Sequence, residues 1–217
     1  MNAQALYDFD GTITSKDTTV FLLIELLKLR PWRFSGLIWL LLRMIVASDS
    51  VSKQGHKNKA IGYLIKDLSD MRLSEALKDF RNKVKNLYRP LVLTSIDQAI
   101  QKGCTVLIVT ASPSFAIGDC LSDFSVVVLG TEFEKKGNIY TGLLKSENCY
   151  GKEKVNRINE WATSKKIVLS VQSAWSDHFS DFDMLSLSAK RYWVGGDQLQ
   201  TLVMDHDPEA NFVNTEQ

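Results

Sequence analysis

Residues 3–14 read Ala-Gln-Ala-Leu-Tyr-Asp-Phe-Asp-Gly-Thr-Ile-Thr, and this stretch decides the fold class. The mostly apolar residues 3–7 predict a short buried strand. Asp8 and Asp10 follow directly, and Gly11 lets the backbone turn because it has no Cβ. Two carboxylates at one strand end repel each other, and Mg²⁺, which prefers hard oxygen ligands, removes that conflict. One carboxylate can then act as a nucleophile and the other as an acid and base.

A bare Asp-x-Asp would more often be a loop with two solvated carboxylates. Here the apolar strand before it and the Gly-Thr-x-Thr after it favour a catalytic site. In open α/β sheets, ligands bind at the carboxyl ends of the strands. The stretch therefore predicts a Rossmann-like α/β fold with its site at that edge.

The composition is that of a globular protein of one or two domains: 217 residues, 45% hydrophobic and 24% charged. A net charge of +1 gives no general attraction for nucleic acid, so no nucleic-acid partner is expected. Cys104, Cys120 and Cys149 are widely spaced, which predicts reduced thiols in a cytoplasmic protein rather than disulfides or a zinc site. A first strand starting near residue 3 leaves no room for a secretory leader, and the tail after Asp205 is expected to be loosely ordered.

Residues 15–95 predict a helical insertion. Its first two helices, at residues 17–29 and 34–46, are apolar almost all round, yet each is shorter than the ~20 residues that span a bilayer. One interpretation makes them the buried core of a small helical bundle. The other exposes part of the hairpin to a membrane surface, with Trp32, Arg30 and Arg43 as interfacial anchors.

The insertion continues with a basic segment, residues 53–66, and a helix at residues 74–88. The basic segment is either a solvated face or a set of cations directed at the substrate. A helix at residues 91–102 leads back to the sheet, where residues 104–110 form a continuous apolar run typical of a buried parallel strand. That strand ends in Thr110-Ala111-Ser112, where a hydroxyl and the amides opening a helix can hold phosphate oxygens.

The last third repeats the pattern of acids and hydroxyls at strand ends. Residues 131–144 predict a β-hairpin. A helix then opens with Lys152 in its first turn, where a cation does not complement the helix dipole, so a role beside the carboxylates is expected; Lys154 is the competing assignment. A strand at residues 168–176 ends in Asp177 and Asp181, beside which His178 is interpreted as a bystander. A last strand at residues 191–194 completes a parallel sheet with helices on both faces.

These four motifs, in this order, resemble the haloacid-dehalogenase superfamily of phosphatases, in its phosphoserine-phosphatase-like branch with a helical cap inserted after the first strand. The apolar cap and the Gly151-Lys152-Glu153-Lys154-Val155 run are also similar to the bacterial phosphatidylglycerophosphatase C type. The resemblance implies a catalytic core of residues 1–14 and 96–217 and an all-α helical-bundle cap of residues 15–95.

The resemblance also implies residue roles. Asp8 attacks phosphorus and forms an aspartyl phosphate, and Asp10 protonates the leaving oxygen and later takes a proton from water. Thr110 and Lys152 complete the catalytic set. The phosphate-binding residues are Gly11, Thr12, Ala111, Ser112 and Lys154, and the Mg²⁺ ligands are Asp8, Asp10 (through its backbone carbonyl), Asp177 and Asp181, of which Asp181 orients a water or the lysine.

The catalytic residues do not decide the substrate. We expect a Mg²⁺-dependent phosphatase of a small soluble phosphate ester, such as phosphoserine or a sugar or alcohol phosphate. Because the cap is apolar and its flank basic, a lipid phosphate hydrolysed at the membrane surface is the alternative, with peripheral membrane contact through the cap. A non-catalytic phosphate-binding regulatory protein is the hypothesis from another class; no defined protein partner is indicated.

Overall fold

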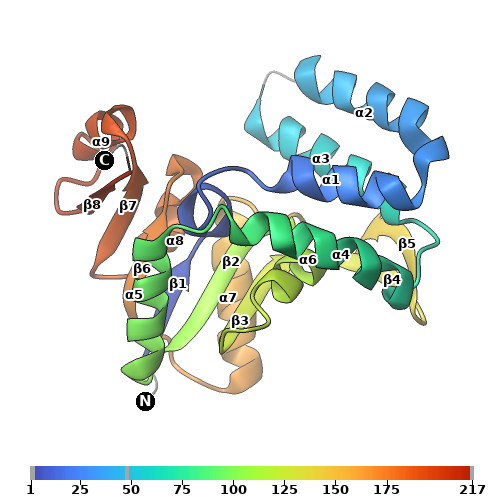
Figure 1. Cartoon of the computed structure of the whole chain (residues 1–217). Coiled ribbons are helices and arrows are strands. Elements are labelled where there is room, and N and C mark those ends of the chain that lie inside the picture. Colours follow the sequence, from blue (N-terminus) through green and yellow to red (C-terminus); the bar gives the residue numbers. More distant parts are fainter. Residues whose placement is uncertain (1–2, 47–48, 216–217) are drawn as a thin grey trace.

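The computed structural model describes residues 3–46 and 49–215, and in it six parallel strands form a sheet with helices on both faces (Figure 1). The order across the sheet is β3-β2-β1-β6-β7-β8, so the first strand of the chain lies in the interior. The strands are β1 (Gln4–Tyr7), β2 (Thr105–Pro113), β3 (Val126–Thr131), β6 (Val171–Ser176), β7 (Arg191–Gly195) and β8 (Asn211–Asn214). The predicted α/β class with a parallel sheet is confirmed.

Side chains that alternate along β1 belong to two separate cores, one on each face of the sheet. Ala5 and Tyr7 pack in the core that includes α5 and α6, whereas Leu6 packs in the core that includes α7 and α8. The helices of this part of the chain are α5 (Pro90–Gln101), α6 (Ser114–Cys120), α7 (Lys152–Lys165), α8 (Phe182–Leu185) and α9 (Asp197–Met204). Burial on both faces explains why the strands are apolar runs and not alternating patterns.

The insertion consists of α1 (Thr19–Leu29), α2 (Phe34–Val46), α3 (Ser50–Ile65) and α4 (Asp70–Lys85). The predicted hairpin also forms, from β4 (Phe133–Lys136) and β5 (Ile139–Leu144), and packs beneath α3. Gly62 permits that contact, because a Cβ there would lie 2.1 Å from the Gly142 carbonyl oxygen. Division of the chain into core and cap stays a prediction, and its boundary at residue 95 lies inside the continuous helix α5.

Of the two interpretations of the apolar helices, the one that buries both is wrong for α2, and the exposure of part of the hairpin that the other expects is observed. In α1, Leu22, Leu23 and Leu26 are buried, but in α2 only Leu37 is, among the residues whose side chains the structure describes. The exposed apolar residues of α2 are Phe34, Ile38, Trp39, Leu42, Ile45 and Val46. Among the described residues, no helix is long and apolar enough to cross a bilayer.

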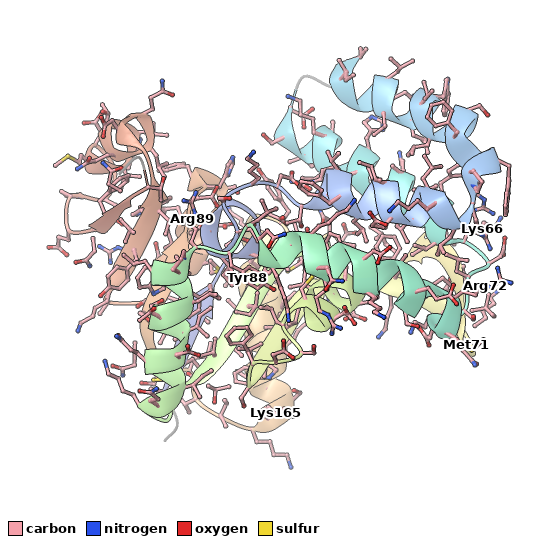
Figure 2. All side chains as sticks on the ribbon, in the orientation of Figure 1. Lys66, Met71, Arg72, Tyr88, Arg89 and Lys165 are labelled. Carbon is pink, nitrogen blue, oxygen red and sulfur yellow. The ribbon has the colours of Figure 1, made fainter. Side chains whose placement is uncertain are left out.

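The chain enters and leaves the insertion side by side. The Arg89 amide donates to the Ile13 carbonyl, and the Ser15 amide donates to the Leu87 carbonyl. Figure 2 shows Tyr88 and Arg89 where α4 gives way to α5, and the Arg89 side chain donates to the Gly11 carbonyl oxygen at 3.2 Å. These contacts fix the insertion against the carboxyl end of β1.

The tail after Asp205, which the sequence predicted to be loosely ordered, instead supplies the edge strand β8, paired with β7. Asp207 anchors it: its carboxylate accepts hydrogen bonds from the Arg191 guanidinium at 2.7–2.9 Å and from the Trp193 indole at 3.1 Å. These hydrogen bonds, from Arg191 above all, lower the Asp207 pKa.

We expect Asp207→Asn to lower the free energy of unfolding by about 1.5–3 kcal/mol at pH 7, the value of hydrogen bonds to a charged group. A carboxylate whose pKa is depressed on folding stabilises the protein above the unfolded pKa of about 4 and loses that effect as the pH falls through the folded pKa. The difference between the two proteins in urea unfolding should therefore shrink on acidification. A constant difference from pH 7 to pH 3 would contradict the ion pair.

Candidate active site

Three neighbouring strands end at the same edge of the sheet and carry the predicted acids and hydroxyl. Because β1 lies between β2 and β6, Asp8 is flanked by Thr110 at the end of β2 and by Asp177 after β6. The Asp8 amide donates to the Trp175 carbonyl at 2.9 Å, which continues the β1–β6 pairing up to the acid itself. Parallel pairing thus brings together residues that are more than 160 positions apart.

The turn Phe9–Ile13 presses its backbone against Asp177. Gly11 has φ = +85°, and a Cβ at this residue would lie 2.0 Å from an Asp177 carboxylate oxygen, so only glycine fits. The Thr12 hydroxyl donates to Asp177 at 2.9 Å and lies 3.5 Å from an Asp8 carboxylate oxygen. The Asp8 and Asp177 carboxylates therefore lie beside one shared hydroxyl.

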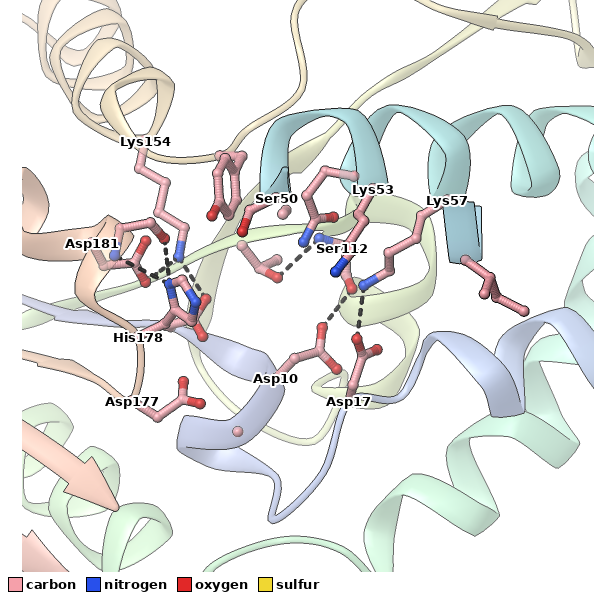
Figure 3. Close-up of a pocket in the computed structure, with 18 residues that line it drawn as sticks. Asp10, Asp17, Ser50, Lys53, Lys57, Ser112, Lys154, Asp177, His178 and Asp181 are labelled. Atoms are coloured by element: carbon pink, nitrogen blue, oxygen red, sulfur yellow. Dashed lines mark hydrogen bonds and ion pairs between the residues drawn. The ribbon is translucent and has the colours of Figure 1, made fainter. Parts of the chain in front are cut away.

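A buried lysine joins Asp8 to Asp181 (Figure 3). Lys154 Nζ lies 2.6 Å from Asp8 Oδ1 and 2.7 Å from Asp181 Oδ2, and the side chains of all three residues are less than 10% exposed. The Ser176 hydroxyl, at the end of β6, donates to the same Asp181 oxygen at 2.7 Å. Burial of the ammonium is tolerated because both of its carboxylate partners are in hydrogen-bonding contact.

The preference for Lys152 over Lys154 is corrected by this geometry. Lys152 is the first residue of α7 and is exposed, whereas Lys154 is buried in the site. Two residues advance a helix by about 200°, so the two lysines lie on opposite sides of α7. The sequence contained the signal, because Val155 and Ile158 mark the apolar side to which Lys154 is adjacent.

Burial and charge dominate the ionisation of the site. Burial raises the pKa values of Asp8 and Asp177, and Asp181 raises them further, while Lys154 opposes the rise. For Lys154, burial alone would lower the pKa, but the Asp181 and Asp8 carboxylates outweigh it and raise the pKa above the ordinary value. Lys154 is thus a fixed cation between Asp8 and Asp181.

Asp10 is oriented by the insertion and by β2, away from the lysine. Its carboxylate accepts hydrogen bonds from the Thr18 amide and hydroxyl, both at 2.7 Å, and from the Ser112 hydroxyl at 2.5 Å. Burial, followed by the nearby Asp17 charge, raises the Asp10 pKa. A carboxyl group with a raised pKa at the edge of a cavity is suited to donating and accepting a proton.

The predicted metal set is brought together only in part. Asp8 and Asp177 adjoin, but the Asp181 side chain is bound by Lys154 and Ser176. Within residues 3–46 and 49–215, no three His, Cys, Asp or Glu side chains converge as a metal-binding group. Two buried carboxylates with raised pKa values nevertheless fit a divalent cation, whose charge would relieve their repulsion.

The predicted phosphate-binding residues lie in the last part of β2 rather than in a loop, and they line the same cavity as the acids. Thr110, Ala111 and Ser112 all contribute to it, and the Thr110 hydroxyl oxygen accepts from the Ser112 amide at 3.0 Å. Thr12 does not line the cavity, and its hydroxyl contacts the Asp177 and Asp8 carboxylates instead. His178, interpreted as a bystander, does line the cavity, with Nδ1 2.8 Å from the Ser180 hydroxyl.

The cavity has a volume of about 550 Å³ and is closed on one side by the insertion. Lys53 and Lys57 of α3 reach it, which supports cations directed at the substrate for this part of the basic segment; Figure 3 shows both beside Asp10 and Asp17. Other lining residues that the sequence did not single out as site residues are Asp17, Ile45, Ser50, Gln54, Tyr150 and Ser180. They come from loops and helix ends, where no motif marks them.

Comparison with solved structures finds the same fold in several proteins. A protein of unknown function from Bordetella pertussis Tohama I superposes with a TM-score of 0.78 at 18% identity, covering 98% of this chain and 99% of that one. A cytosolic 5'-nucleotidase IIIB bound to cytidine gives 0.73 at 13% identity, with coverage of 100% and 81%. A phospho-aspartyl intermediate analogue of phosphoserine phosphatase gives 0.59 at 15% identity, with coverage of 100% and 94%.

No curated protein sequence matches this chain. The model of haloacid dehalogenase-like hydrolases, however, matches residues 5–186, a span that contains all four motifs. The chain therefore belongs to the haloacid dehalogenase-like hydrolase family, as the resemblance of its motifs predicted.

Proposed function

We propose that this protein is a Mg²⁺-dependent phosphatase that hydrolyses a phosphate monoester through an aspartyl phosphate on Asp8. One observation carries the proposal: the Asp8 carboxylate lies in the cavity at the end of β1, between the Lys154 ammonium and the Asp177 carboxylate. Membership of a hydrolase family and a fold shared with a phosphoserine phosphatase captured as a phospho-aspartyl analogue support it.

In the first half-reaction an Asp8 carboxylate oxygen bonds to phosphorus, and the bond from phosphorus to the ester oxygen breaks. The leaving oxygen takes the electron pair of that bond and a proton from Asp10, whose raised pKa favours the protonated form. Thr18 and Ser112 hold the Asp10 carboxyl group in place, so the proton is delivered from a fixed position.

In the second half-reaction a water molecule gives a proton to Asp10 and attacks phosphorus. The bond from phosphorus to Asp8 breaks, inorganic phosphate is released, and the Asp8 carboxylate is restored. Lys154 opposes the negative charge at Asp8 throughout, while the Thr110 hydroxyl and the Ala111 amide would bind the phosphoryl oxygens. Asp181 and Ser176 are positioning residues, because they act through Lys154.

Asp8 and Asp177, with the backbone carbonyl of Asp10, are the residues that would hold Mg²⁺. When bound, the ion offsets the charge of the phosphoryl oxygens and of the carboxylates around them. Without such a cation, three carboxylates against one ammonium would repel a phosphate dianion. The arrangement of charge is thus the chemical reason for a metal requirement.

The sequence favours a small soluble phosphate ester as the substrate, and this stays a proposal. The alternative, a lipid phosphate, is supported by an apolar groove in the helical insertion. Resemblance to the phosphatidylglycerophosphatase C type and a cytoplasmic location, with peripheral membrane contact, stay predictions. A non-catalytic phosphate-binding role is separated from all of these by a turnover assay.

We expect Asp8→Asn to lower the turnover of p-nitrophenyl phosphate by on the order of 10⁴-fold or more, because the nucleophile is lost. Asp183→Asn is the matched control, since Asp183 is an exposed acid in the first turn of α8, two residues after Asp181. Circular dichroism would verify that both variants fold. Substantial turnover by Asp8→Asn would refute the covalent step.

Removal of divalent cations should abolish turnover, and added Mg²⁺ should restore it. Mg²⁺ should also raise the thermal midpoint of the wild type, because a ligand that binds only the folded state stabilises it. Asp177→Asn should lose most of that thermal shift. An equal shift in this variant would exclude Asp177 as a ligand.

The two lysines in the first turn of α7, Lys152 and Lys154, offer a second matched pair. Lys154→Met should lower kcat by about 10²–10³-fold, as expected for a lost electrostatic contact to the reacting group. Lys152→Met should leave kcat near the wild-type value, since Lys152 is exposed. The reverse order of effects would overturn the assignment of Lys154.

A further inference from the structure

The helical cap contains an apolar groove between α1 and α2. Its volume is about 270 Å³, and Asp17 and Lys57 provide the charged groups among its lining residues. Its apolar lining consists of Val20, Leu23, Ile24 and Leu27 of α1 with Phe34, Leu37 and Leu41 of α2. Val20, Ile24 and Phe34 are 61%, 44% and 56% exposed, so the walls of the groove are open to water.

The groove exists because α1 and α2 have different packing partners. Helix α2 packs along α3, while α1 packs chiefly against α4, where the buried Glu25 pairs with Lys83 at 2.6 Å. Figure 1 shows α2 lying apart from α4 on the far side of α1. Apolar side chains facing a solvated groove carry an unfavourable hydration free energy, which an apolar ligand would relieve.

The groove adjoins the catalytic cavity. Asp17 and Lys57 line both hollows and form an ion pair of 2.8 Å between them. Ile45, near the end of α2, also lines the catalytic cavity, so apolar surface extends to its rim. Lys53 and Lys57 add positive charge on the path from Asp8 to the groove.

We propose that this groove binds the hydrocarbon chain of an amphiphilic phosphate monoester whose phosphate is held at Asp8. The inference rests on the proposed phosphatase function and names the substrate class of that site. The polar part of such a molecule would pass Lys53 and the Asp17–Lys57 ion pair, where charged groups are matched, and its chain would cover Val20, Ile24 and Phe34. A small, fully polar phosphate ester would leave the groove uncovered.

The groove is distinct from the outer face of α2. Trp39 and Leu42, both more than half exposed, do not line the groove, and the Arg43 guanidinium lies 4.5 Å from the centre of the Trp39 ring. Substitutions can therefore distinguish a hydrocarbon chain bound in the groove from an aggregate of amphiphiles bound to the outer face of α2.

The first experiment measures kcat/KM for n-alkyl phosphates from ethyl to decyl, all below the concentration at which they form micelles. We expect kcat/KM to rise by up to about fourfold for each added methylene, which corresponds to its burial, until the groove is filled. A flat series with good hydrolysis of p-nitrophenyl phosphate would overturn the groove while leaving the phosphatase proposal intact.

The second experiment compares two variants that each place a carboxylate on an exposed apolar position. Ile24→Glu, inside the groove, should flatten the chain-length series by lowering kcat/KM for decyl phosphate toward the value for ethyl phosphate. Leu42→Glu, on the outer face of α2, should leave the series as in the wild type. If neither variant flattens the series, or if Leu42→Glu does so, the groove is not the chain-binding site.

A readout that does not require turnover uses Asp8→Asn and isothermal titration with decyl phosphate and ethyl phosphate. We expect decyl phosphate to bind at least 10-fold more tightly, and Ile24→Glu in the same background to remove the difference. Equal binding of the two ligands would overturn the groove even if no substrate is hydrolysed.

Discussion

The contact between Lys154 and the Asp8 and Asp181 carboxylates is the constraint on which the site depends. A buried ammonium is costly unless carboxylates surround it, and buried carboxylates are costly unless a cation joins them. Neither partner is local: the acids follow β1 and β6, and the lysine comes from the first turn of α7. The sheet order and the placement of α7 must therefore both be correct before the charges can be buried.

The same constraint explains the small residues and hydroxyls around the acids. Gly11 lets the turn after β1 approach Asp177, and Thr12 supplies a hydroxyl shared with Asp8. The Ser176 hydroxyl donates a second hydrogen bond to the Asp181 oxygen that Lys154 contacts. Each of these groups compensates for water that has been excluded from a charged site.

The helical cap is coupled to the chemistry through its entry segment. Thr18, which directly precedes α1, holds the Asp10 carboxylate, and Asp17 beside it pairs with Lys57 of α3. A change in the position of α1 or α3 would thus move the groups that orient the acid and base. Thr18 and Asp17 thus connect the insertion to the group that the proposed mechanism uses as acid and base.

The sequence predicted the parallel sheet, the hairpin and the three strand ends of the site, because each has a local pattern: apolar runs, a turn at Lys136, Gly137 and Asn138, and acids or hydroxyls at the end of a strand. The sequence predicted the site less well where the outcome depends on which side of a helix a residue occupies. Lys152 and Lys154 are equivalent in composition, and only their angular positions on α7 distinguish them. The burial of α2 was left open for a related reason, since an apolar sequence does not say whether a packing partner is present.

The sequence by itself determined the fold class and the family and predicted Asp8, Asp10, Thr110 and Asp177 as site residues, because these depend on residue type at the end of a strand. Only the tertiary structure decided which lysine neutralises them, that Asp181 holds this lysine, that residues 211–214 complete the sheet, and that α1 and α2 leave an apolar groove beside the cavity. The reason is physical: the first set follows from local chain geometry, whereas the second depends on distances between segments that only packing brings together.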